Sequence, residues 1–231
     1  MVTKVSTIIR CMATVVAILI AFSLTSNAQK MVKLTVPVDT LKVRAAADGE
    51  RYNALLTRFI AADTTLTVEE AAFVYYGYYD APIERKTPSF TERINALDSV
   101  KAGNYEAAYA MLSKLIENNP VAAQNIYKAY LCAQSTGRVE EAKCLLYKSL
   151  LRARVIMASG NGKTLETALY VNEISDEYFF LYDIVKAPRI KGQRLEIHDG
   201  HKYDILTIEE NGKTFDIYFL TMMSASDILL N

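Results

Sequence analysis

The chain has 231 residues with 26 basic and 26 acidic side chains, so its formal net charge is zero. Proteins that bind nucleic acid carry a basic stripe, so this balance argues against nucleic acid as a partner. It argues equally against an anionic membrane surface. The length is enough for one larger domain or two small ones.

The first 28 residues have the pattern of a cleavable secretory signal peptide. Lys4 and Arg10 lead into an apolar run over 12–24, and small residues up to Ala28 follow it. The run is shorter than the ~20 residues that a membrane-spanning helix needs. Cys11 precedes the run instead of following it, so we expect no lipid anchor. We predict cleavage after Ala28, no membrane span in the mature chain, and a periplasmic or secreted protein.

After the signal peptide we predict an α+β fold with a helical region over 29–157 and a smaller region over 158–231. Residues 33–44 are expected to be irregular or to form one short strand. Asp48 caps an amphipathic helix, and Thr67 with Glu70 forms a capping box for a second helix over 68–77.

Two copies of one pattern follow, opened by Gly103 and Gly137, which are 34 residues apart. This spacing is the period of tetratricopeptide repeats, and the second helix of each copy resembles that class. Each copy places a small alanine, Ala108 or Ala142, where two helices must pack closely. The pattern predicts two helical hairpins, over residues 89–116 and 121–154. Such repeats usually build binding surfaces and not catalytic centres.

Cys132 and Cys144 fall on the two helices of the second predicted hairpin. An oxidising compartment permits a disulfide between them. Because disulfide geometry is demanding and the side chains need not point at each other, the sequence leaves this pairing open.

Two tight turns predict an antiparallel sheet near the C-terminus. Asp199-Gly200 and Asn211-Gly212 are two-residue loops that suit the twist of antiparallel strands. They pair His198 with His201 and Leu195 with Asp204. A strand over 169–173 and a helix starting at the cap Ser175 precede these hairpins.

One face of the predicted sheet is apolar, and we expect it to be buried against the Ser175 helix. Its members are Leu195, Ile197, Leu206, Ile208, Phe215, Ile217 and Phe219. Asp204 lies in the middle of this face. A carboxylate there needs partners, because an unpaired buried charge is costly.

Several short motifs occur in a specific order along the chain. They are Asp63-Thr-Thr-Leu-Thr, Tyr75-Tyr76-Gly77, Asp176-Glu177-Tyr178, Gly200-His-Lys-Tyr203-Asp204 and Tyr218-Phe219. Together they resemble a family of secreted bacterial proteins known as domain of unknown function 4919. The resemblance covers about 51–219 and implies one evolutionary unit. It implies no activity, cofactor or catalytic residue, so the roles of the motif residues stay open.

The two histidines offer one candidate for metal chemistry. His198 and His201 face each other across a turn, and Glu196 lies on the same face, so the three can ligate zinc or copper. The alternative is that both rings simply flank a solvated turn. No further metal-ligand pattern supports the site, so we expect no cofactor.

The acids of Asp176-Glu177-Tyr178 can supply acid–base groups, but acids in the first turn of a helix usually complement its dipole. Nucleophilic catalysis needs a base beside the nucleophile, and the only imidazoles are at the hairpin tip. No catalytic set assembles, so we do not expect an enzyme.

The four tyrosines around Gly77 are the candidate partner-binding surface. Tyr75, Tyr76, Tyr78 and Tyr79 are nearly consecutive, so one helix cannot bury them all, and exposed tyrosines favour protein or sugar ligands. The alternative is that two or three pack between the first helices and the repeats. The preferred function is a protein- or peptide-binding scaffold of the cell envelope, with metal binding and glycan binding as alternatives and the oligomeric state open.

Overall fold

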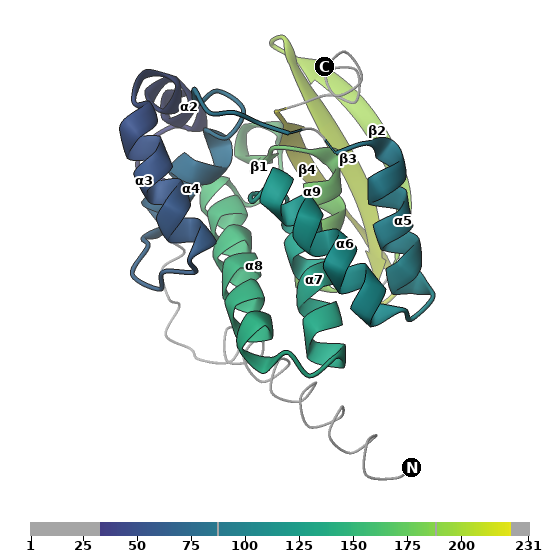
Figure 1. Cartoon of the computed structure of the whole chain (residues 1–231). Coiled ribbons are helices and arrows are strands. Elements are labelled where there is room, and N and C mark those ends of the chain that lie inside the picture. Colours follow the sequence, from purple (N-terminus) through teal and green to yellow (C-terminus); the bar gives the residue numbers. More distant parts are fainter. Residues whose placement is uncertain (1–32, 87, 188, 223–231) are drawn as a thin grey trace. The chain divides into compact units, whose positions relative to one another are not determined.

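The structure is a computed structural model that describes residues 33–222 apart from 87 and 188 (Figure 1). The expected signal peptide lies outside the described residues. The described helices are α2 (Val38–Ala47), α3 (Gly49–Ile60), α4 (Val68–Tyr76), α5 (Phe90–Lys101), α6 (Tyr105–Asn118), α7 (Ala123–Ser135), α8 (Val139–Ser159) and α9 (Ile174–Tyr178). Shorter elements η1 (Leu165–Thr167) and η2 (Phe179–Val185) join strands β1 (Leu169–Val171), β2 (Ile190–His198), β3 (His201–Glu210) and β4 (Lys213–Thr221). The fold is α+β, as predicted.

Helix α2 corrects the prediction of an irregular or extended segment at its position. It buries Val38, Leu41 and Ala45, one narrow stripe at helical spacing, and it packs against α4. Its remaining residues are polar or small apart from Val43, which is exposed, so the apolar periodicity of the helix is weak in the sequence.

Helix α4 packs against three other helices, α2, α3 and α8. Seven of its nine residues are buried, on all sides of the helix. The predicted capping box is confirmed, because Thr67 accepts from the Glu70 N–H while Glu70 accepts from the Thr67 N–H.

The two predicted hairpins are α5–α6 and α7–α8, and their turns repeat one local structure. Gly103 and Gly137 have φ angles of 75° and 76°. The backbone N–H of the next residue, Asn104 or Arg138, donates to the carbonyl five residues back at 2.9 Å in both copies. This shared turn supports the description of the hairpins as repeats.

The helices form a continuous array in the spatial order α3-α4-α8-α7-α6-α5, and α2 packs on α4 and α3. Figure 1 shows α3 towards one side of this array and α5 at the other. Helix α5 packs chiefly on α6, α6 on α7, α7 on α8, and α8 on α4. Helix α7 also contacts α9 and η2, which connect the array to the sheet.

The sheet has the strand order β1-β4-β3-β2. The two predicted antiparallel hairpins are confirmed in register, with His198 opposite His201 and Leu195 opposite Asp204. Strand β1 adds parallel to β4. This makes the sheet mixed, where the sequence predicted an antiparallel one.

The predicted buried face is covered only over its middle. Leu206, Ile208 and Phe219 are buried, but Leu195, Ile197 and Phe215 are 63%, 70% and 47% exposed. The exposed residues lie near the two turns, at the ends of the hairpins. The expectation that they are buried was wrong: Phe180 of η2 packs on Phe219 and Glu177 of α9 lies beside Asp204, in the middle of the face, while the residues near the turns are exposed.

Candidate functional site

Three carboxyl groups of the motif residues are buried where α9 meets the sheet. Asp176 and Glu177 come from α9, and Asp204 comes from β3. They are between 0% and 7% exposed, and Glu177 lies beside Asp204. We call these three residues the buried carboxyl cluster. The sequence pattern favoured first-turn acids that complement the helix dipole, whereas the fold uses these acids inside the protein.

Tyr75 connects this cluster to the helical array. Its hydroxyl donates to Oδ2 of Asp176 at 2.5 Å and accepts from the backbone N–H of Asn172 at 2.9 Å. The Asn172 side-chain amide donates to the Tyr75 carbonyl at 2.6 Å. Tyr75 is thus held at its hydroxyl and at its backbone, and it positions the carboxyl group of Asp176.

Arg152, a buried cation on α8, completes the polar core. It is 2% exposed, and its guanidinium carbon lies 4.2 Å from the centre of the Tyr75 ring and 5.3 Å from that of Phe59. Its Nη1 donates to the carbonyl of Val121. Arg152 also lowers the pKa of Asp176 through its charge. Arg152 was not among the residues predicted from the sequence, although an arginine within the run Leu150-Leu151-Arg152-Ala153 is a signal of a buried charge.

Burial in the cluster raises the pKa of all three carboxyl groups. Burial raises the pKa of Asp176 to about 7, with a further increase from Glu173 and a decrease from Arg152. Burial raises the pKa of Glu177 to about 8, and the bond from Thr221 opposes this increase. A proton on Glu177 makes it a hydrogen-bond donor to the neighbouring Asp204 carboxylate.

Two further side chains lie between the cluster and the surface. The Tyr178 hydroxyl donates to Oε1 of Gln193 at 2.9 Å, and Nε2 of Gln193 donates to Oδ2 of Asp204 at 2.6 Å. Gln193 is exposed and Tyr178 is half-buried. This chain of hydrogen bonds links the buried Asp204 carboxyl group to the surface.

The tyrosine surface is corrected by the structure. Tyr75, Tyr76 and Tyr78 are at most 3% exposed, and Tyr79 is half-buried. Their hydroxyls bind inside the protein: Tyr76 donates to the carbonyl of Tyr170, Tyr78 to that of Asn118, and Tyr79 to the Glu173 carboxylate. They join α4 and the turn after it to the rest of the fold, and Tyr79 is the one of the four that is partly exposed.

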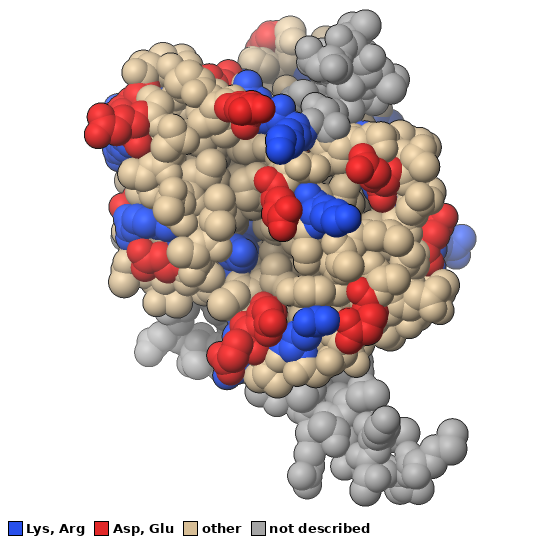
Figure 2. Space-filling view, in the orientation of Figure 1, with Lys and Arg blue, Asp and Glu red and all other residues tan. Residues whose placement is uncertain are grey.

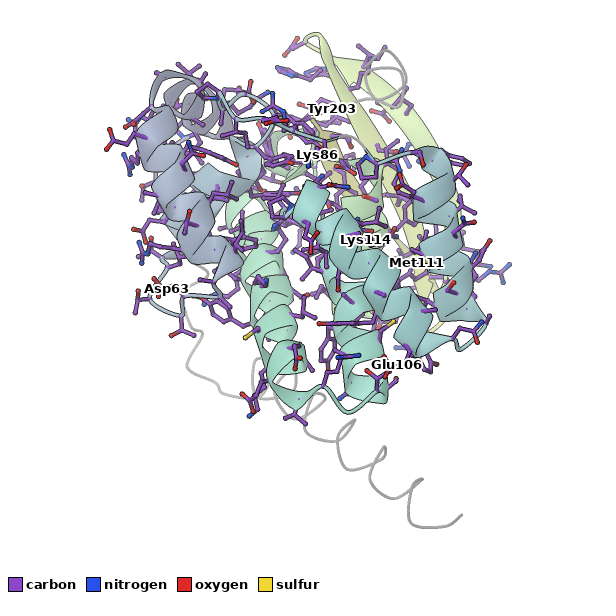
Figure 3. All side chains as sticks on the ribbon, in the orientation of Figure 1. Asp63, Lys86, Glu106, Met111, Lys114 and Tyr203 are labelled. Atoms are coloured by element: carbon purple, nitrogen blue, oxygen red, sulfur yellow. The ribbon has the colours of Figure 1, made fainter. Side chains whose placement is uncertain are left out.

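The remaining motif residues have local structural roles and do not gather in one place. Asp63 closes the α3–α4 connection by accepting from Thr65 at 2.7 Å and from Arg58 at 2.7 Å, and these bonds lower its pKa to about 2. Gly200 supplies a φ of 78° in the β2–β3 turn, and Tyr203 is buried against Ala168. Figure 3 shows Asp63 and Tyr203 on opposite sides of the protein.

The hairpin-tip histidines have neighbours that do not form a metal centre. His198 lies 3.3 Å from a carboxylate oxygen of Asp199, while Glu196 pairs with Arg194 at 3.2 Å. Within residues 33–222, where described, no three His, Cys, Asp or Glu side chains are grouped to hold a metal ion.

The two cysteines of the second hairpin are free. Cys132 is buried and Cys144 is exposed, and no disulfide joins them in the structure.

Fold and site together define an α+β protein in which helical hairpins and a four-stranded mixed sheet share a buried polar core. The family model for domain of unknown function 4919 matches residues 40–227, so the chain belongs to this family. No curated protein and no solved structure matches the chain. Among the helices that the structure describes, none is long and apolar enough to cross a membrane.

Proposed function

We propose that the mature chain is an exported, non-catalytic scaffold that binds another protein in the cell envelope. One observation carries this proposal. Helix α7 of the second hairpin already holds a helical segment, α9–η2, while α5, the matching helix of the first hairpin, leaves apolar side chains exposed.

The contact between α7 and η2 shows how the array binds a helix within one chain. The rings of Tyr127 and Phe179 have centroids 5.9 Å apart. Lys128 lies 3.2 Å from Oδ1 of Asp183, and the Lys186 ammonium donates to the Tyr127 hydroxyl at 3.0 Å. Aromatic packing flanked by charged groups is a common way for an interface to combine affinity with orientation.

The charge distribution suits a protein partner. Figure 2 shows acidic and basic side chains interspersed on the visible face, with uncharged stretches between them. A surface of this kind lacks the single-sign field that steers nucleic acid or anionic membranes. The covered carboxyl groups likewise support a structural role for the polar core, because a catalytic acid or base must reach its substrate.

The test is crosslinking and co-purification of the tagged protein from its own cells, with an unrelated exported protein carrying the same tag as control. We expect one protein to be enriched reproducibly with this chain and not with the control. If no protein is enriched above the control, the scaffold proposal is contradicted. Sequencing the mature N-terminus from the same preparation tests cleavage after Ala28, and an intact leader would contradict export by a cleaved signal peptide.

A further inference from the structure

Helix α5 is unusual in this fold because it buries so little. Of its twelve residues only Ala96 is fully buried, and Phe90 and Ile94 are 72% and 38% exposed. Leu97, one turn further on, is half-buried. These three positions follow the i, i+4, i+7 spacing of one helical face. We call Phe90, Ile94 and Leu97 the α5 apolar face.

The start of α5 is well formed, so the exposed face belongs to a stable helix. Ser89 accepts from the backbone N–H of Glu92, and the Glu92 carboxylate accepts from the backbone N–H of Ser89. Such a capping box satisfies the free amides of the first turn. The helix therefore presents its apolar residues in a fixed geometry before any partner binds.

The repeat gives this face a counterpart whose use is visible in the structure. A shift of 34 residues places Ile94 at the position of Lys128 and Leu97 at that of Leu131, both on α7. Helix α7 contacts η2, and at the first of these positions Lys128 pairs with Asp183 of η2. The α5 apolar face is thus the equivalent of a surface that binds a helix within the chain.

The substitutions between the two faces indicate what α5 would hold. Where α7 has Lys128, which pairs with Asp183, α5 has the apolar Ile94. At the position of Tyr127 on α7, α5 has Arg93. Among the described residues, no acidic side chain forms a salt bridge with Arg93. The complementary ligand has apolar residues on one helical face and an acidic residue beside them.

We propose that the α5 apolar face docks an amphipathic helix of a second protein, with its apolar side chains on Phe90, Ile94 and Leu97 and an acidic group near Arg93. This inference rests on the proposed scaffold function and names the docking surface and the partner chemistry. It extends to α5 the geometry in which α7 holds η2.

The first measurement is site-specific photocrosslinking in the protein's own cells, with p-benzoylphenylalanine in place of Phe90. Mass spectrometry then identifies the crosslinked residue. We expect it to lie in another protein, within a segment that has apolar residues at i, i+3 or i+4 and i+7 and a nearby acid. Crosslinks to a second copy of this chain, to its residues 223–231, or to an extended segment would overturn the proposal. The absence of any crosslink would overturn it as well.

The second measurement uses a synthetic peptide of the crosslinked segment and the purified mature protein. Fluorescence anisotropy should give a Kd at least about tenfold weaker for Phe90→Ala/Ile94→Ala, because buried apolar anchors dominate such interfaces. Arg93→Glu should weaken binding several-fold, and more at low salt, if an acid lies opposite. The matched control is Leu195→Ala/Ile197→Ala, which removes two similarly exposed apolar side chains from β2 and should leave Kd within about twofold.

The outcomes separate this inference from the scaffold proposal. If a partner co-purifies equally well with wild type and with folded Phe90→Ala/Ile94→Ala, the scaffold function stands and the α5 site is wrong. If no partner co-purifies with wild type, both are contradicted. An unchanged circular dichroism spectrum and unfolding midpoint for the variant exclude loss of folding as the cause of lost binding.

Discussion

The hydroxyl of Tyr75 donates a 2.5 Å hydrogen bond to Asp176, which is 101 residues later in the chain. This bond joins α4, which packs against α2, α3 and α8, to α9. The next residue on α9, Glu177, lies beside Asp204 of β3. The buried carboxyl cluster therefore connects the helical hairpins with the sheet, and it holds α9 and η2 at the place where η2 packs on α7.

Replacing Tyr75 with phenylalanine should destabilise the protein, because Tyr75→Phe removes the donor to Asp176 and the acceptor of the Asn172 N–H. Leaving such buried groups unsatisfied costs about 1–3 kcal/mol. Urea unfolding followed by circular dichroism measures this loss. Tyr182→Phe is the matched control, since Tyr182 is 46% exposed and should change the unfolding free energy by less than about 0.5 kcal/mol. Equal losses in the two variants would contradict the role of the Tyr75–Asp176 bond.

The buried carboxyl cluster should make stability depend on pH. The pKa of Glu177 rises from its ordinary 4.5 to about 8 on folding, so the folded state keeps a proton that the unfolded chain has released. The unfolding free energy then falls as pH rises from about 4.5 to about 8, and levels off above that. Asp176, with its pKa raised to about 7, contributes in the same direction at lower pH. Urea unfolding at pH 5.5, 7 and 8.5 tests this expectation, with pH values set by the cited shifts.

Glu177→Gln isolates the contribution of Glu177, because glutamine resembles the protonated acid and cannot ionise. We expect the variant to lose less stability than wild type between pH 5.5 and 8.5. Glu117→Gln, at an exposed position on α6, should keep the wild-type slope. A Glu177→Gln slope equal to that of wild type would show that Glu177 does not retain the proton.

Local signals in the sequence were sufficient to predict the turns of the sheet and the register of its two hairpins. The features that the sequence did not predict depend on packing between distant segments. Asn211-Gly212 determines which residues of β3 and β4 face each other, so Asp204 lies opposite Phe219 as the loop length predicts. The parallel pairing of β1 with β4 joins residues 50 apart, and no turn encodes it. The exposure of Leu195 depends on which elements pack on the sheet, and strand alternation does not contain that information.

The tyrosines and acids of the site show the same limit. Helix α4 reads Val-Glu-Glu-Ala-Ala-Phe-Val-Tyr-Tyr, and a helix that is apolar on all sides is buried. The apolar character of α4 on all sides therefore predicts that its tyrosines are buried, and it outweighs the argument that one helix cannot bury neighbouring tyrosines. The interpretation of Asp176 as an acid that complements the helix dipole considered only its own helix, α9. Its hydrogen-bond donor is Tyr75 on a distant helix, and this pairing has no signature within either segment.

Gly77 should be required for close packing between α2 and α4. A Cβ atom at this position would lie 2.3 Å from the Cβ of Ala45 and 2.7 Å from the carbonyl oxygen of Phe73. Gly77→Ala should therefore cost about 1–3 kcal/mol through overpacking. Gly192→Ala is the matched control, because a Cβ there meets nothing within 4 Å. Thermal unfolding of both variants makes the comparison, and a Gly77→Ala midpoint as high as that of Gly192→Ala would contradict this close contact between α2 and α4.

Cys132 and Cys144 should react very differently with a thiol reagent. Cys144 is exposed, while Cys132 is buried and burial raises the pKa of its thiol. Because the thiolate is the reactive form, Ellman's reagent should label Cys144 quickly in the native protein and Cys132 only after unfolding. Cys144→Ser should then show almost no native reaction, whereas Cys132→Ser should react like wild type. If neither thiol reacts in denaturant until a reductant is added, a disulfide joins them and α7 must pack against α8 in a different position.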